Sequence, residues 1–170
     1  MVPLLLRMRS CLPEPFESSS EAKTHKMERT HFETLITMYD AAPINKWFKP
    51  RLRIPEEGRA EIELLVREEF HHAAHSIHGA VYFKALDDAT FFAVQSLVTD
   101  CFVVTSAFQL YFLRPVSDGQ LISRGQVVSR SKRLYIAEGV LLDSRGREVA
   151  RGSGTFMPSS IQLGPDLGYR

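Results

Sequence analysis

Residues 79–97 are apolar on nearly every side of a helix, and this limits the folds open to the chain. They read GAVYFKALDDATFFAVQSL, with Lys84, Asp87 and Asp88 as the charged residues. A helix that is apolar all round must be buried, because water would otherwise meet apolar surface on every side. The stretch is too short, and too often interrupted by charge, to cross a membrane. We therefore expect a buried helix that other elements surround.

The rest of the chain predicts strands that can cover this helix. Runs rich in β-branched and aromatic residues lie at 103–113, 121–130, 134–142 and 148–156, with turn signals between them, and shorter alternating runs lie at 50–54 and 60–66. Short turns between successive strands mean antiparallel pairing. The sequence therefore predicts the α+β class, with one curved antiparallel sheet around one central helix.

The remaining segments suggest one domain with an extension at each end. Residues 13–26 are polar and lack apolar periodicity, so we expect a flexible N-terminal extension over 1–27, with Met27 as an alternative start. A helix is predicted from Thr30, an N-cap with Glu33 three residues on, to the break at Ala42-Pro43. The domain is expected over 28–160, followed by a C-terminal tail over 161–170.

Charge and cysteine usage exclude several classes. The formal net charge is +1, so no bulk field attracts nucleic acid or an anionic membrane, and neither is expected as a partner. Cys11 and Cys101 are far apart and form no CxxC pair, which argues against a disulfide scaffold and predicts a cytoplasmic protein.

Two features of the buried helix predict chemistry. His78-Gly79 stands at its start, where backbone amides have no internal partner and can stabilise a negatively charged oxygen. Asp87 lies in the third turn, where desolvation by Phe83 and Phe91 should raise its pKa while Lys84 lowers it. Asp88 points roughly 100° away round the helix. We therefore expect Asp88 to pair with Lys84 four residues before it rather than share a site with Asp87.

These residues carry a family resemblance. The run His78-Gly79-Ala80, followed by Asp87 and Asp88, resembles the HGG…D signature of PaaI-like hotdog-fold acyl-CoA thioesterases, with Ala80 in place of the second glycine. Thr105 and FLRP at 112–115 continue the resemblance, as do Asp118-Gly119 and ARGSGTF at 150–156, so that it covers about residues 30–157. It implies the hotdog fold.

The resemblance also implies roles for individual residues. Asp87 would activate water or attack the thioester, and the amide of Gly79 would bind the thioester oxygen. Thr105, contributed by the partner subunit, would position the water or the carboxylate, and His78 is the helix-entry histidine. His72 stands where the family usually has Asn or Gln as a hydrogen-bond donor to the carbonyl, and an imidazole N–H can also donate.

Two groups of residues leave alternatives open. His71, His72, His75 and His78 invite a metal site, but the segment follows a strand and has no cysteine nearby, which favours a metal-free loop. Arg114, Arg130, Lys132 and Arg133 are either solvated strand ends or contacts for the phosphates of coenzyme A.

We therefore predict hydrolysis of an acyl thioester, with acyl-CoA or an acyl-carrier thioester as substrate and without a cofactor, coenzyme A being part of the substrate. The alternatives are a hotdog enoyl-thioester hydratase or dehydratase and a non-catalytic acyl-CoA-binding module. The uncharged run 103–113 would be an aggregation hazard in a monomer. A homodimer or a dimer of dimers is therefore expected, with the active site across the interface.

Overall fold

The structure, a computed structural model, describes residues 19–170, with side chains from Thr30 onward. The helices are α1 (Ser19–Ala41), α2 (Asn45–Phe48) and α3 (Gly79–Gln95), and short 3₁₀ turns cover Glu68–Phe70 and Pro165–Leu167. The strands are β1 (Arg51–Glu56), β2 (Arg59–Leu65), β3 (Cys101–Phe112), β4 (Gln120–Arg130), β5 (Tyr135–Leu142) and β6 (Glu148–Gln162). Residues 1–18, which make up most of the predicted extension, lie outside the described residues.

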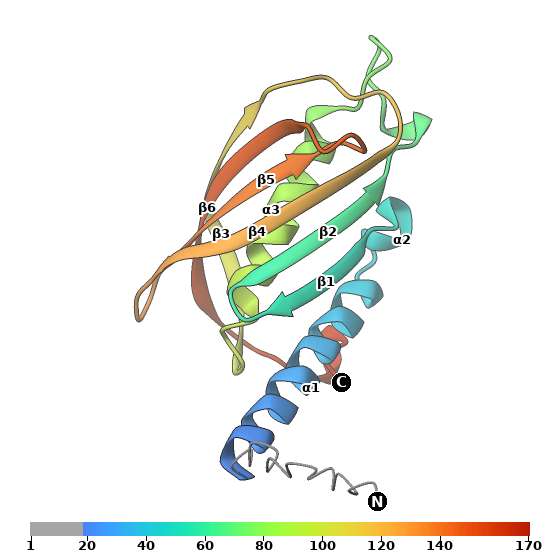
Figure 1. Cartoon of the computed structure of the whole chain (residues 1–170). Coiled ribbons are helices and arrows are strands. Elements are labelled where there is room, and N and C mark those ends of the chain that lie inside the picture. The colour runs from blue at the N-terminus through green and yellow to red at the C-terminus, as the bar shows by residue number, and fades with distance from the viewer. Residues whose placement is uncertain (1–18) are drawn as a thin grey trace, which may run out of the picture.

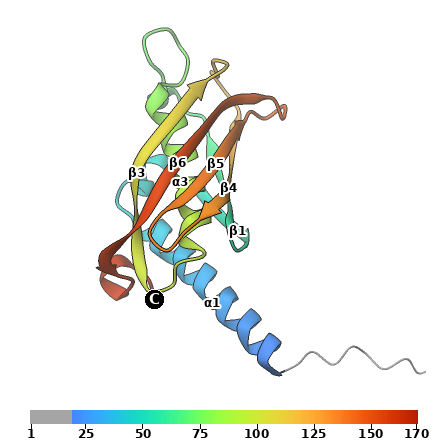
Figure 2. The same cartoon turned by 90° about the vertical axis from the view of Figure 1, so that its left-hand side faces the viewer.

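The strands form one antiparallel sheet that curves around α3 (Figure 1). The order β1-β2-β4-β5-β6-β3 leaves β1 and β3 as its edges, and Figure 2 shows β3 along one side of the sheet. This arrangement confirms the predicted α+β class and the hotdog architecture. From residue 19 to the C-terminus, no helix combines the length and apolar character that crossing a membrane requires.

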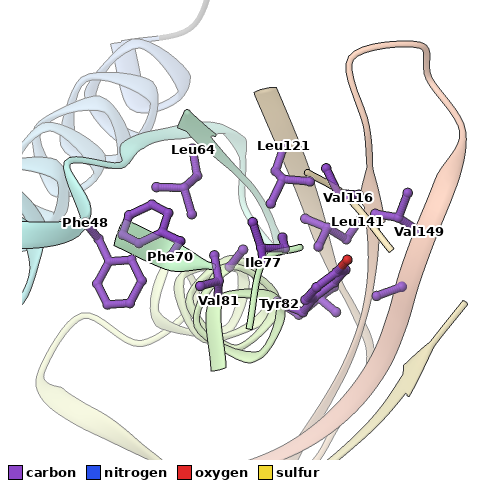
Figure 3. Packing of buried hydrophobic residues seen from close by; sticks show 13 residues of the cluster. Phe48, Leu64, Phe70, Ile77, Val81, Tyr82, Val116, Leu121, Leu141 and Val149 are labelled. Atoms are coloured by element: carbon purple, nitrogen blue, oxygen red, sulfur yellow. The ribbon is translucent and has the colours of Figure 1, made fainter. Parts of the chain in front are cut away.

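Burial of apolar side chains holds α3 against the concave face of the sheet. Leu64 of β2, Leu121 of β4 and Leu141 of β5 converge on the first turns of the helix, around Val81 and Tyr82 (Figure 3). Each fully buried side chain of this kind contributes roughly 1.5–3 kcal/mol relative to leaving it in water. The predicted burial of the apolar helix is thus confirmed.

Gly125 of β4 allows α3 to approach the sheet at van der Waals distance. A Cβ atom at this position would lie 2.3 Å from the carbonyl oxygen of Ala89 and 2.6 Å from the amide nitrogen of Thr90. Both are backbone atoms of α3, so no side-chain rotation relieves the overlap. The helix can lie this close to β4 only because residue 125 has no side chain.

Both ends of the chain differ from the sequence prediction. Helix α1 begins at Ser19, so the predicted start at Thr30 is wrong, as is the linker assignment for residues 19–26. Glu21, Ala22 and Lys23 are good helix formers and extend α1 without a cap at Thr30. At the other end β6 runs on to Gln162, because β3 is long enough to pair with it as far as Cys101.

We expect Gly125→Ala to lower the free energy of unfolding by about 3 kcal/mol, the upper end of the usual cost of overpacking, because the overlap is with backbone atoms. Chemical denaturation measures the change. Gly164→Ala is the matched control, since Gly164 is extended (φ −172°) and nothing lies within 4 Å of its added Cβ. Equal stability of the two variants would contradict the close approach of α3 to β4.

Candidate active site

Asp87 forms a hydrogen-bonded pair with Thr105. Asp87 lies in the third turn of α3, and Thr105 lies on the neighbouring edge strand β3. The Thr105 hydroxyl donates a hydrogen bond of 3.0 Å to Asp87 Oδ1. Both residues belong to the same chain, so the expectation that the partner subunit supplies Thr105 is wrong. The physical reason is that β3 follows α3 after a short turn and runs back alongside it.

The buried side chain of Gln95 fixes this turn. Its amide nitrogen donates to the carbonyl oxygens of Val98 (2.8 Å) and Cys101 (2.9 Å), and its Oε1 accepts from the amide of Val103 (2.9 Å). One hydrogen bond thus holds the turn itself, and two tie the last turn of α3 to the first residues of β3. They set the register that brings Thr105 opposite Asp87.

Burial changes the acidity of Asp87. Desolvation raises the pKa of its carboxyl group to about 6, and the hydrogen bond from Thr105 offsets part of that rise. The negative charge of Asp88 raises this pKa further and Lys84 lowers it. This confirms the predicted direction for both burial and Lys84. Asp87 is therefore ionised at neutral pH but close enough to its pKa to take up a proton.

Asp88 is held by other partners, as predicted. Lys84 forms an ion pair with Asp88 Oδ2, and the Tyr39 hydroxyl of α1 donates to the same oxygen at 2.5 Å. Lys84 and Asp88 are only 14% and 15% exposed, so the pair is largely withdrawn from solvent. Sequence reasoning missed Tyr39, because no local spacing connects α1 to α3. With two partners on one oxygen, Asp88 is a structural carboxylate, whereas Asp87 has one partner and remains accessible.

Asp87 and Thr105 lie in the wall of a cleft of about 610 Å³. The cleft runs between α1, α3, β3 and the C-terminal segment, and its lining is mostly apolar. The apolar side chains that line it include Met38, Ile44, Phe91, Phe92, Phe102, Val103 and Leu167. Phe91, which was expected to desolvate Asp87, is therefore in this wall. Asp88 and Asp166 also line the cleft, but Asp87 is the carboxylate that Thr105 binds beside the apolar cavity.

The start of α3 opens into a second, smaller cavity. Gly79 lines it together with His72, Tyr82, Phe112 and Arg114. The His78 imidazole caps the helix, because its Nδ1 accepts the amide of Ala80 at 3.1 Å. The amide of Gly79 is the first of the helix and has no intrahelical acceptor, and it lies at the positive end of the dipole.

His72 has a defined donor in this second cavity. Its Nδ1 accepts the amide of Ala74 at 3.1 Å, so in the neutral ring Nε2 carries the proton. The imidazole can therefore donate a hydrogen bond from Nε2, as the sequence analysis requires of this position.

The four histidines do not converge on one point. His71 Nε2 contacts the carbonyl oxygen of Ser117 at 2.9 Å, while His72 and His78 each use Nδ1 to hold a backbone amide. Among the side chains that the structure describes, from Thr30 onward, no group of three or more His, Cys, Asp or Glu is arranged to hold a metal ion. The imidazoles of His71, His72 and His78 stabilise the loop that leads into α3.

The basic residues separate into two places. Arg114 lines the cavity at the start of α3 and donates to the Glu148 carbonyl oxygen at 2.8 Å. Arg130, Lys132 and Arg133 lie at the β4–β5 hairpin, which is the far end of β4 from Gly119 and the start of α3 (Figure 1). In a single chain, Arg114 is thus the one of the four that lies beside Gly79 and His72.

Comparison with known proteins connects this geometry to a family. The model of the Thioesterase superfamily matches residues 74–150, which span α3, β3, β4 and β5. "Putative esterase SSO1253" of Saccharolobus solfataricus is 28% identical over 102 residues, covering 60% of this chain and 68% of that protein.

Solved structures share the fold. The PaaI protein of the E. coli phenylacetic acid degradation operon matches with a TM-score of 0.74 at 21% identity, over 81% of this chain and 99% of that one. A thioesterase family protein from Silicibacter pomeroyi matches with a TM-score of 0.65 at 22% identity, over 73% and 96% of the two chains. These identities are low, so the likeness concerns the fold. The resemblance to PaaI-like thioesterases is confirmed.

The acidity of Asp87 can be measured directly. A carboxyl-carbon NMR titration should give a midpoint near pH 6 for Asp87. In Thr105→Val the midpoint should move to higher pH, because the hydroxyl that stabilises the charged form is lost. Ser106→Ala is the control, since Ser106 bonds to Thr155 and not to Asp87. An unchanged or lower midpoint in Thr105→Val would show that the hydroxyl does not act on Asp87.

Proposed function

Because the chain resembles PaaI-like thioesterases of the hotdog fold, we propose that it hydrolyses an acyl thioester, with acyl-coenzyme A as the substrate. One observation carries the proposal. Asp87 is an accessible carboxylate in an apolar cleft, hydrogen-bonded by Thr105, with a pKa raised to about 6. A general base works best when its pKa lies near the working pH.

In this mechanism Asp87 removes a proton from a water molecule that attacks the thioester carbonyl carbon. A C–O bond forms, the C–S bond breaks, and the thiolate leaves with the proton that Asp87 took up. Thr105 orients the carboxylate through its hydrogen bond. These steps need neither a metal ion nor an organic cofactor.

The negative charge that develops on the thioester oxygen needs a hydrogen-bond donor. The amide of Gly79 at the start of α3 suits this task, because it is free and lies at the positive end of the helix dipole. Gly79 and Asp87 are, however, eight residues apart on one helix, which is about 12 Å at 1.5 Å per residue. They also line different cavities. One thioester group cannot touch both in the same chain.

A two-fold dimer solves this problem. Edge strand β3 has an unpaired side, and Val104, Tyr111, Phe112 and Leu113 are exposed on or beside it. If β3 pairs antiparallel with its copy about an axis near Phe108 and Gln109, Thr105 faces the partner's Phe112. Phe112 lies beside Gly79 of its own chain, within 3.1 Å of a Cβ added there. The partner subunit's Gly79 then lies near Asp87.

In this dimer, one subunit supplies Asp87 and Thr105 to each site, and the other supplies the N-terminus of α3 with Gly79 and the preceding loop with His72. His72 donates from Nε2 to the carbonyl oxygen beside the Gly79 amide, and His78 keeps the helix start in place. Arg114 lies on the same side and is our candidate for a phosphate of coenzyme A. We place the enzyme in the cytoplasm, which is supported by the free, buried thiol of Cys101.

Asp87→Asn should lower hydrolysis by on the order of 10²–10⁴, the usual cost of losing a general base, while the protein stays folded. Release of free thiol from a panel of acyl-CoA esters measures the activity. Asp88→Asn is the matched control and should cost far less, because Asp88 serves Lys84 and Tyr39. The reverse outcome would show that Asp88 is the base.

The same panel separates the alternative functions. A hydratase would consume an enoyl-CoA without releasing thiol, and a binding module would bind the esters without turning them over. Either result from the unaltered protein would remove hydrolysis as its function.

The shared site predicts which pairs of inactive variants complement each other. Mixed dimers of Asp87→Asn with Gly79→Pro should recover up to about half of the activity, because one of the two sites is then intact. Mixed dimers of Asp87→Asn with Thr105→Val should show no more activity than Thr105→Val alone. The reason is that one subunit supplies both Asp87 and Thr105 to a given site, so neither site is intact.

Gly79→Ala is the control for Gly79→Pro. It adds a Cβ close to Phe112 but keeps the amide, and Phe112 is 58% exposed and free to move. Gly79→Ala should therefore stay active. Recovery by the Thr105 pair instead of the Gly79 pair would mean that the two halves of the site are divided differently.

A further inference from the structure

The last residues of the chain close one end of the cleft that contains Asp87. After β6, Leu163 donates its amide to the Asp100 carbonyl oxygen (3.2 Å), and a 3₁₀ turn follows at Pro165–Leu167. Leu167 and Gly168 then line the cleft together with Met38 and Phe102. This C-terminal segment, residues 163–169, lies beyond the part of the chain that matches the family model.

A buried histidine of α1 holds the C-terminal segment in place. His31 is 6% exposed, and its Nε2 lies 3.1 Å from the Gln95 carbonyl oxygen. A carbonyl only accepts, so Nε2 carries the proton. Nδ1 must then accept the Tyr169 hydroxyl at 2.7 Å. Burial lowers the pKa of His31, which favours this neutral form.

A glycine allows the segment to pack against α1. Gly168 has φ +80°, a left-handed conformation that a side chain disfavours. Its added Cβ would also lie 3.1 Å from the Cβ of Ala41. The packing of Gly168 against α1 and the His31–Tyr169 contact together hold the C-terminal segment in a fixed position, so that it forms a wall of the cleft.

The wall stands at the end of an apolar path that starts at the Asp87–Thr105 pair. Along α3 the path passes Phe91, one turn or about 6 Å beyond Asp87. Along β3 it passes Phe102, three residues or about 10 Å from Thr105. Leu167 packs with the same cluster of side chains as Phe91 and Phe102. An acyl group bound at Asp87 would therefore extend toward Leu167.

The charges around the cleft restrict the acyl group further. Lys84 is already paired with Asp88, and the other charged lining residues, Asp87 and Asp166, are acidic. A second carboxylate on the acyl group would meet negative charge with no free cation in the described lining. The cleft therefore suits an uncharged, apolar acyl group.

We propose that Leu167, held by the His31–Tyr169 contact, is the specificity-determining end wall of the acyl site. It restricts the substrate to uncharged acyl groups of medium length. This inference rests on the proposed thioester hydrolysis, since it assigns the acyl half of the same site.

The test compares straight-chain acyl-CoA esters of increasing length. Leu167→Ala should move the optimum of kcat/KM to longer chains, and Leu167→Trp to shorter ones. For the longest ester that the unaltered protein accepts, Leu167→Trp should lower kcat/KM about tenfold or more, since a misfit of one methylene costs 10–200-fold. Ile161→Trp is the matched control, because Ile161 is exposed and does not line the cleft. An identical length profile in all variants would overturn the proposal.

Tyr169→Phe tests the contact that holds the wall. It should broaden the profile toward longer chains by raising kcat/KM for long esters, with kcat for short esters unchanged. A general loss of structure would lower both alike, so a uniform decrease contradicts a positioning role for Tyr169.

Binding separates this inference from the proposed function. The Kd of each ester is measured on Asp87→Asn with and without the Leu167 substitutions, which requires no turnover. Suppose that the unaltered protein releases no thiol, but the Leu167 substitutions shift the dependence of Kd on chain length as predicted. Hydrolysis is then wrong, and the role of Leu167 as end wall is supported. If thiol is released but the Leu167 substitutions change neither Kd nor kcat/KM, the role of Leu167 is wrong and the proposed hydrolysis is supported.

Discussion

The structure depends on the burial of one apolar helix by a single sheet. Because α3 is apolar on almost every side, all six strands of the sheet contact it, and Gly125 brings β4 against its backbone. This six-stranded sheet does not close around the helix, so β3 ends it with an unpaired side. The same constraint thus produces the core and an edge that a second copy can cover.

Burial of α3 also accounts for the chemistry of its two carboxylates. Burying a carboxylate on an apolar helix costs desolvation free energy, and the two carboxylates are compensated to different extents. Asp88 is compensated by Lys84 and Tyr39, which join α3 to α1. Asp87 is only partly compensated by Thr105, and its pKa stays raised to about 6. Incomplete compensation leaves Asp87 suited to exchange a proton near neutral pH.

The two ends of the cleft are built by different parts of the chain. The α3–β3 turn, fixed by Gln95, positions Asp87 and Thr105 opposite each other, and that region falls within the match to the Thioesterase superfamily. The segment that closes the far end comes from residues beyond it, held by His31 and Tyr169. Under the proposed function, this division would allow the acyl preference to change without disturbing the Asp87–Thr105 pair.

Much of this could be predicted from the sequence, because it depends on neighbours along the chain. The apolar periodicity of α3, the alternation of the strands and the Lys84–Asp88 pair at i and i+4 all follow from local geometry. The position of Gly79 at a helix start is of the same kind. Only the tertiary structure decided that Thr105 serves Asp87 of its own chain, that Tyr39 binds Asp88 and that residues 163–169 close the cleft. These contacts join residues far apart in sequence, and they depend on strand register and sheet curvature, which no local pattern encodes.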